Sequence, residues 1–277
     1  MGGEHSAEAQ QLDLFQRWEE MTASRRCEEV TLPSSPLVSL RELQRWATAS
    51  CKIIFGPDWG SGPYIVVFRI RRNQVLHGVM TNNHVLDKKK LRVGKNVQLR
   101  LHNAETITLQ LSEVGIRFTC PLLDVTFIEL KDADVLNMVE HGVNFLKLSS
   151  SYQRTCPGTA IAVMQYPQNR SEPFYAQGQV YSLWGTCILH NASTDHGSSG
   201  SGIVSMRRGV VVAIHRARHH AMKANVGVRA PVVVQAIKKV INVNIAHHKP
   251  AKKLNDHELQ ELENLGLHPT KIGRAHV

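Results

Sequence analysis

The chain of 277 residues lacks the features that mark several specialised classes of protein. It holds no run of roughly 18 apolar residues, so no membrane-spanning helix and no membrane partner are expected. Its first 15 residues contain no basic stretch followed by an apolar core, so no secretory signal is expected. Aromatic residues make up only 6% of the chain, which disfavours a platform for stacking nucleic-acid bases. We therefore expect a cytoplasmic or otherwise intracellular protein.

Cysteine is scarce and widely spaced. The five cysteines are Cys27, Cys51, Cys120, Cys156 and Cys187. No CxxC or CxxH pair occurs, which disfavours a structural zinc site, and the odd number favours reduced thiols. His215, His219 and His220 lie close together, but their segment is predicted to be a strand followed by a loop, with no further ligands nearby. We expect no metal ion and no cofactor.

Positive charge is concentrated in the middle of the chain. The net charge is +10 overall, and residues 51–245 alone carry +12. Such a balance favours acidic partners or substrates. A basic cluster, Lys88–Lys90 with Arg92 and Lys95, is interpreted as a solvated loop, so nucleic acid is not an expected partner. The sequence gives no indication of the oligomeric state.

The hydrophobic pattern predicts helices at the two ends and strands between them. Helical spacing covers residues 7–22, and Ser39 with Glu42 predicts a capping box that opens a helix over residues 40–49. A closing helix is predicted over residues 229–242, beginning just after Pro231. The runs of strand type between them are 51–56, 64–70, 77–83, 96–101, 106–111, 124–130, 159–166, 178–184, 186–190, 202–206 and 209–215.

These short runs predict an all-β barrel or sandwich. Residues 1–49 are predicted to form a helical N-terminal extension, and residues 246–277 a tail. We interpret the final KIGRAHV, residues 271–277, as a sequencing artefact and exclude it from the reasoning on the fold.

Three short motifs stand in a fixed order along the predicted strands. In the first motif, MTNNHVL, a predicted strand ends at His84. In the second, Asp124 opens the apolar run DVTFIEL, and in the third Ser199 lies in the small-residue turn GSSGSG. A serine hydroxyl needs a base to take its proton, and histidine has a suitable pKa for that task. A carboxylate fixes the imidazole tautomer. Glycines let the turn point two backbone N–H groups, those of Gly197 and Ser199, at a developing oxyanion.

Over residues 51–245 the sequence resembles the chymotrypsin-like serine peptidases, most closely the glutamyl-endopeptidase and exfoliative-toxin branch. That branch shows TN-x-H-V, D-[LV]-x-x-[IVL] and G-x-S-G-S-[PG], and this chain has TNNHV, DVTFI and GSSGSG. The resemblance implies two antiparallel six-stranded β-barrels, with an active site in the cleft between them. The peptidase domain would span residues 50–245, with barrel one at about 50–145 and barrel two at about 146–245. His84 would be the general base, Asp124 its orienting carboxylate and Ser199 the nucleophile.

The resemblance also carries expectations about specificity. His215 and Thr194 match pocket residues that hydrogen-bond a Glu or Gln side chain before the scissile bond (position P1), and Gly227 matches a residue of the pocket wall. Ser193 stands where a trypsin-like pocket would hold an aspartate. Val85 follows the histidine where secreted animal trypsins have a cysteine. These departures indicate an intracellular, disulfide-free enzyme.

Two functions therefore compete. The first is a serine endopeptidase that acts on a protein or peptide substrate, with a preference for Glu or Gln at P1. The second is a catalytically silent fold that binds a protein or nucleic acid through its basic surface. The presence of His84, Asp124, Ser199 and the flanking glycines favours the peptidase, because a silent fold is free to lose any of them.

Overall fold

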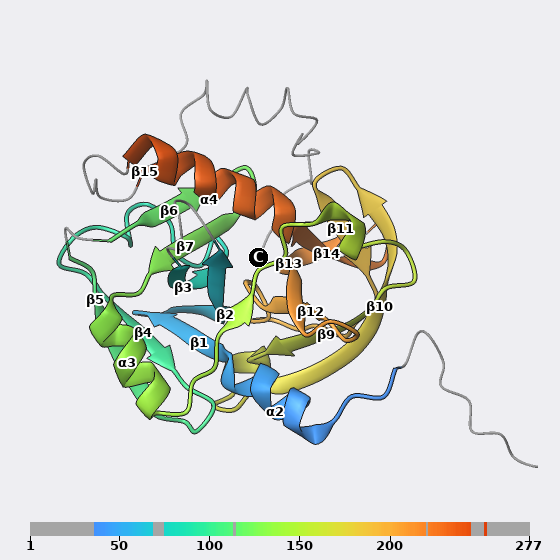
Figure 1. Cartoon of the computed structure of the whole chain (residues 1–277), viewed down its shortest axis with the longest axis horizontal. Helices are drawn as coiled ribbons and strands as arrows, with labels where there is room; N and C mark the ends of the chain where they lie inside the picture. Colours follow the sequence, from blue (N-terminus) through green and yellow to red (C-terminus); the bar gives the residue numbers. More distant parts are fainter. Residues whose placement is uncertain (1–35, 69–74, 113–114, 220, 245–251, 254–277) are drawn as a thin grey trace, which may run out of the picture. The chain divides into compact units, whose positions relative to one another are not determined.

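A computed structural model describes residues 36–68, 75–112, 115–219, 221–244 and 252–253, all within one compact unit (Figure 1). The regular structure is mostly β, which confirms the predicted fold class. The predicted helix over residues 7–22 and most of the predicted tail lie outside the described residues. No helix among the described residues is both long enough and apolar enough to cross a membrane.

The N-terminal half is built on one curved sheet. Its main strands are β1 (Ser50–Phe55), β2 (Asp58–Phe68), β3 (Val75–Thr81), β4 (Asn96–Arg100), β5 (Thr106–Gln110), β6 (Arg117–Cys120) and β7 (Val125–Glu129). These seven pair antiparallel in the order β6-β7-β3-β2-β1-β4-β5. Two short strands, β15 (Lys252–Lys253) and β8 (Leu146–Lys147), pair parallel with β6 and β2.

This sheet forms the half-barrel of the predicted double-barrel fold. Strands β5 and β6 do not pair with each other among the described residues, so the sheet stays open at that seam. The buried side chain of Arg117 lies there and donates a hydrogen bond to the carbonyl of Ser112.

The C-terminal half is a closed barrel of six strands. They are β9 (Ala160–Gln165), β10 (Phe174–Trp184), β11 (Cys187–His190), β12 (Gly202–Ser205), β13 (Val210–His219) and β14 (Ala224–Arg229). They pair in the order β10-β11-β14-β13-β12-β9, all antiparallel, which confirms the prediction for this half. Small and β-branched residues, among them Ile161, Val163, Ile203 and Ala213, form a fully buried cluster.

Among the described residues three α-helices lie around the strands: α2 (Leu40–Thr48), α3 (Asp132–Glu140) and α4 (Ala230–Asn244). The predicted N-cap of α2 is confirmed, because Ser39 Oγ accepts from the Glu42 N–H at 3.2 Å. The Glu42 carboxylate instead accepts from Arg45 at 3.1 Å, so it does not close the predicted capping box. Helix α4 begins before Pro231, whose missing N–H is tolerated in a first turn. Two short 3₁₀ turns complete the regular structure, η1 (Tyr152–Arg154) and η2 (Pro167–Asn169).

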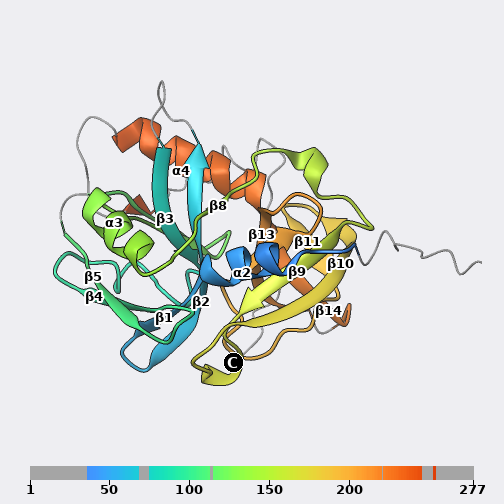
Figure 2. The ribbon, with the colours of Figure 1, turned by 60° about the horizontal axis from the view of Figure 1, so that its bottom comes forward.

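The largest hydrophobic cluster joins the two halves. Trp46 of α2 and Phe118 and Phe127 of the N-terminal sheet belong to the same buried cluster as Ile214 of β13 and Val233 of α4. Figures 1 and 2 show α4 extending from the C-terminal barrel toward the N-terminal sheet. Burial of this shared apolar surface fixes how the loops of the two halves face each other. The predicted domain boundaries stay predictions.

Candidate active site

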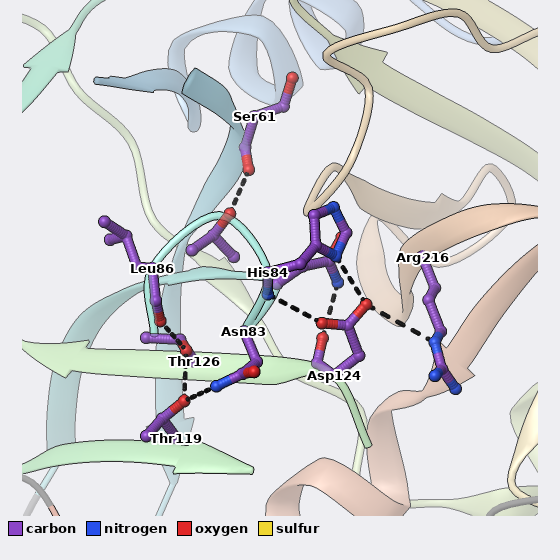
Figure 3. A network of polar contacts seen from close by, with 10 residues as sticks. Ser61, Asn83, His84, Leu86, Thr119, Asp124, Thr126 and Arg216 are labelled. Atoms are coloured by element: carbon purple, nitrogen blue, oxygen red, sulfur yellow. Dashed lines mark hydrogen bonds and ion pairs between the residues drawn. The ribbon is translucent and has the colours of Figure 1, made fainter. Parts of the chain in front are cut away.

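His84 lies in a turn that directly follows strand β3. The Asn82 carbonyl accepts from the N–H groups of Val85 and Leu86, at 3.2 and 3.1 Å, which winds the chain into one helical turn. The His84 Nδ1 lies 2.8 Å from Asp124 Oδ2, and the His84 N–H donates to Oδ1 at 3.0 Å (Figure 3). Because an ionised carboxylate only accepts, Nδ1 carries the proton and Nε2 keeps its lone pair in the neutral ring.

Asp124 is held in a tight turn between β6 and β7. Its φ of 52° lies in the left-handed region, which aspartate tolerates better than most residues. The Asn82 side-chain amide donates to the Asp124 carbonyl at 2.8 Å, and the Asp124 N–H donates to the Pro121 carbonyl at 3.2 Å. Asn82 is fully buried, so it ties the histidine turn to the aspartate turn.

A chain of hydroxyl contacts supports the same two turns from the sheet side. Asn83 donates to Thr119, the hydroxyls of Thr119 and Thr126 lie 2.9 Å apart, and Thr126 donates to the Leu86 carbonyl at 2.7 Å (Figure 3). Thr119 and Thr126 are fully buried on neighbouring strands. Buried polar groups joined in this way restrict the orientation of the turn that carries His84.

Ser199 lies in a turn that enters β12 of the C-terminal barrel. Gly197 and Gly200 have φ values of 88° and 87°, which favour glycine. A Cβ on Gly197 would collide with the ring of Trp59, and a Cβ on Gly200 would collide with the Ser61 carbonyl. Close packing against the other half therefore requires glycine at both positions.

The backbone around Ser199 leaves two donors available. The Gly200 N–H donates to the His215 carbonyl at 3.0 Å, and the Ser201 N–H donates to the Ser198 carbonyl at 3.0 Å. Within the described part of the chain, the N–H groups of Gly197 and Ser199 donate no hydrogen bond to protein. Such a pair of unused donors is what an oxyanion site needs.

Ser61 of β2 is a linking residue that the sequence patterns missed. Its N–H donates to the Ser199 carbonyl at 2.9 Å, and its hydroxyl donates to the Gly197 carbonyl at 2.8 Å. Its own carbonyl accepts from the Thr81 hydroxyl at 2.9 Å, at the end of the strand that leads to His84 (Figure 3). Ser61 thus joins the Ser199 turn to the His84 strand, although no described hydrogen bond joins the Ser199 and His84 side chains directly.

The predicted pocket residues lie in the C-terminal barrel. His215 of β13 is buried, and its Nδ1 lies 3.4 Å from Nε2 of the buried His190. Burial lowers the pKa of His190 to about 4, and burial together with the nearby histidines lowers the pKa of His215 well below its usual value. Both rings are therefore neutral near pH 7.

Gly227 and Thr194 take different positions around this pair. Gly227 lies opposite His215 in the strand ladder, and a Cβ there would meet Ile203 and Ala213 of the barrel interior. Thr194 is half-buried in the loop that leads to Ser199. That loop is anchored by a hydrogen bond of 2.9 Å from the Gln165 side chain to the Ser193 carbonyl.

Arg216, which the sequence connects with a preference for acidic substrates because it follows His215, contacts Asp124 in the structure. It follows His215 on β13, and its Nε lies 3.5 Å from Asp124 Oδ2, the same oxygen that faces His84 (Figure 3). The Arg216 and Asp124 side chains are 19% and 11% exposed, so water screens this pair only in part. Within the described residues no group of three His, Cys, Asp or Glu side chains is arranged to hold a metal ion.

Comparisons with known proteins agree with this architecture. A family model described as "Trypsin-like peptidase domain" matches residues 68–214. A serine endoprotease from Yersinia pestis is 14% identical to this chain with a TM-score of 0.54, and the match covers 78% of this chain and 68% of the endoprotease chain. A mutant of Rv3671c from M. tuberculosis, in its inactive form, is 16% identical with the same TM-score, and the match covers 78% of this chain and 98% of the Rv3671c chain. These structures confirm the double-barrel fold. No curated protein matches the chain significantly.

Proposed function

We propose that this chain, which belongs to the family of trypsin-like peptidase domains, is a serine endopeptidase that works through an acyl-enzyme. The observation that carries the proposal is the double contact of Asp124 with His84, through Nδ1 at 2.8 Å and the backbone N–H at 3.0 Å. In the neutral ring this contact places the proton on Nδ1 and leaves Nε2 with its lone pair, and about half of the side chain is exposed. A base in this state can accept the proton of a serine hydroxyl.

In the proposed mechanism Ser199 attacks the carbonyl of the scissile peptide bond while His84 takes the hydroxyl proton. Asp124 stabilises the imidazolium that forms. The N–H groups of Gly197 and Ser199 bind the oxyanion, where one such donor contributes about 3–4 kcal/mol. His84 then gives its proton to the leaving amine, and water releases the acyl group by the same route. The hydrogen bond between Ser199 and His84 would form when substrate binds, because catalytic hydrogen bonds often reach their working geometry only in the substrate complex.

For specificity we propose that His215 and Thr194 recognise Glu or Gln at P1, with Gly227 in the pocket wall. The His215 ring is held through Nδ1 by His190, so its other nitrogen is the one available to a ligand. A buried polar group that is left unpaired is costly, so a P1 side chain without a matching polar atom would be rejected. The expected result for His215→Ala is a loss of cleavage after Glu and Gln that exceeds the loss after other residues. An equal loss across a peptide library would remove His215 from the pocket.

Three variants test the proposed roles. Ser199→Ala and His84→Ala should each lower kcat by about 10⁴-fold or more, and Asp124→Asn by about 10⁴-fold. Matched controls outside the site are Ser150→Ala, whose side chain is exposed, and His141→Ala, whose side chain is half-buried. Each variant is checked by circular dichroism and thermal melting. Folded variants with wild-type cleavage would refute the roles, and a folded wild type that cleaves nothing would favour the binding-module alternative.

A further inference from the structure

The Asp124 carboxylate is shared between two positively polarised partners from different halves of the molecule. Its Oδ2 lies 2.8 Å from His84 Nδ1 and 3.5 Å from Arg216 Nε (Figure 3). Its Oδ1 accepts from the His84 N–H. Arg216 comes from β13 of the closed barrel, whereas His84 and Asp124 come from turns of the open sheet.

We infer that Arg216 is a positioning residue of the proposed active site, and that its charge sets the pH at which His84 becomes a working base. The inference rests on the proposed function of His84 and Asp124. The guanidinium holds the carboxylate from the side of the second barrel. It also offsets part of the negative charge that would otherwise favour a protonated His84 ring.

Three other titratable groups of the described residues interact with these side chains, and each is electrically neutral near pH 7. His215, which precedes Arg216 on β13, interacts electrostatically with His84, but burial lowers its pKa. Cys120 of β6 interacts with both Asp124 and Arg216, and Cys187 of β11 interacts with Arg216. Burial raises the pKa of both thiols, so they stay protonated. Among these groups Arg216 is the one permanent cation.

The sign and size of the effect follow from Coulomb's law. A protonated His84 ring and the Arg216 guanidinium are like charges, separated by no more than the sum of their two contacts to Oδ2. Their repulsion favours the neutral ring, so removing the guanidinium charge should move protonation of the ring to higher pH. At an effective dielectric constant of about 20, with further screening because the ring is half-exposed, the expected shift is about one pH unit.

The first experiment follows the titration of the His84 ring by NMR in the full chain, with the resonance assigned by its loss in His84→Gln. In Arg216→Gln and Arg216→Ser the midpoint should rise by about one pH unit. Arg216→Lys keeps the charge and should restore most of the wild-type midpoint. Arg218→Gln, a matched control, removes the same charge two residues along β13 and should shift the midpoint by about 0.3 units or less. Midpoints within 0.2 units of wild type in both neutral variants would overturn the inference.

The second experiment measures the rate of inactivation by a fluorophosphonate as a function of pH. The acid limb of this profile should move upward in Arg216→Gln by the amount seen in the NMR titration. A wild type that does not react would contradict the proposed peptidase function, while the NMR titration still decides the role of Arg216. If the wild type reacts but Arg216→Gln leaves the acid limb where it is, the inference about Arg216 is overturned and the proposed peptidase function stands.

Discussion

Replacing Ser61 with alanine isolates the link between the two halves of the proposed active site. The Ser61 hydroxyl donates to the Gly197 carbonyl at 2.8 Å and accepts from the Tyr166 N–H at 2.9 Å, and the side chain is 1% exposed. Alanine removes both hydrogen bonds and leaves a buried carbonyl and a buried N–H without partners. Each of these two orphaned groups costs about 1–3 kcal/mol, so the free energy of unfolding should fall by about 2–6 kcal/mol.

The assay combines thermal melting with peptidase kinetics. For a unit of about 200 residues, each kcal/mol lowers Tm by about 2–4 °C, so a loss of this size lowers Tm by roughly 4–24 °C. Because Gly197 carries a proposed oxyanion donor, a looser turn should also lower kcat at a temperature where the variant is fully folded. Ser150→Ala makes the same change at an exposed position and should leave both quantities within error. A Ser61→Ala protein with wild-type Tm and kcat would refute the role assigned to this link.

Two further predictions concern packing and pH. Gly200→Ala should lower the free energy of unfolding by about 3 kcal/mol or more and abolish activity, because its φ is 87° and the Ser61 carbonyl blocks a Cβ. The control Gly94→Ala, with φ 78° and open space around it, should lower the free energy of unfolding by only about 1 kcal/mol, and equal losses in urea unfolding would contradict the steric argument. His190 keeps its neutral form down to about pH 4, whereas the unfolded chain binds a proton below about pH 6.5, so stability is complete above pH 6.5 and declines as the pH falls toward 4. Between pH 7 and pH 5 the free energy of unfolding in urea should therefore fall by roughly 2 kcal/mol more in the wild type than in His190→Leu. The same pH dependence in both proteins would exclude His190 as the cause.

Features encoded in short stretches of sequence were predicted well. The strand runs follow from β-branched residues bounded by Gly, Pro and Asn, and most of them match observed strands. The N-cap at Ser39 is likewise local, because the capping hydroxyl and its donor at Glu42 are three residues apart. The two motifs that contain His84 and Asp124 can be recognised in the sequence, and the structure brings these two side chains together.

Features that depend on contacts between residues far apart in the sequence could not be predicted. Ser61 and Arg216 carry no local pattern, since their contacts with the Ser199 turn and with Asp124 arise only when the two halves pack. The open seam between β5 and β6 likewise has no local signal, because alternation along a strand does not reveal which strands pair. Strand β6 has four residues, all buried and half of them polar or charged, so it lacks the alternation that marks a half-exposed strand.

The most direct test of the peptidase function is the intact mass of the full chain after reaction with a fluorophosphonate. The proposed site predicts one covalent adduct on the wild type and none on Ser199→Ala, with Ser150→Ala modified like the wild type. A folded wild type that gains no adduct, or a Ser199→Ala protein that still gains one, would contradict the assignment of Ser199 as the nucleophile.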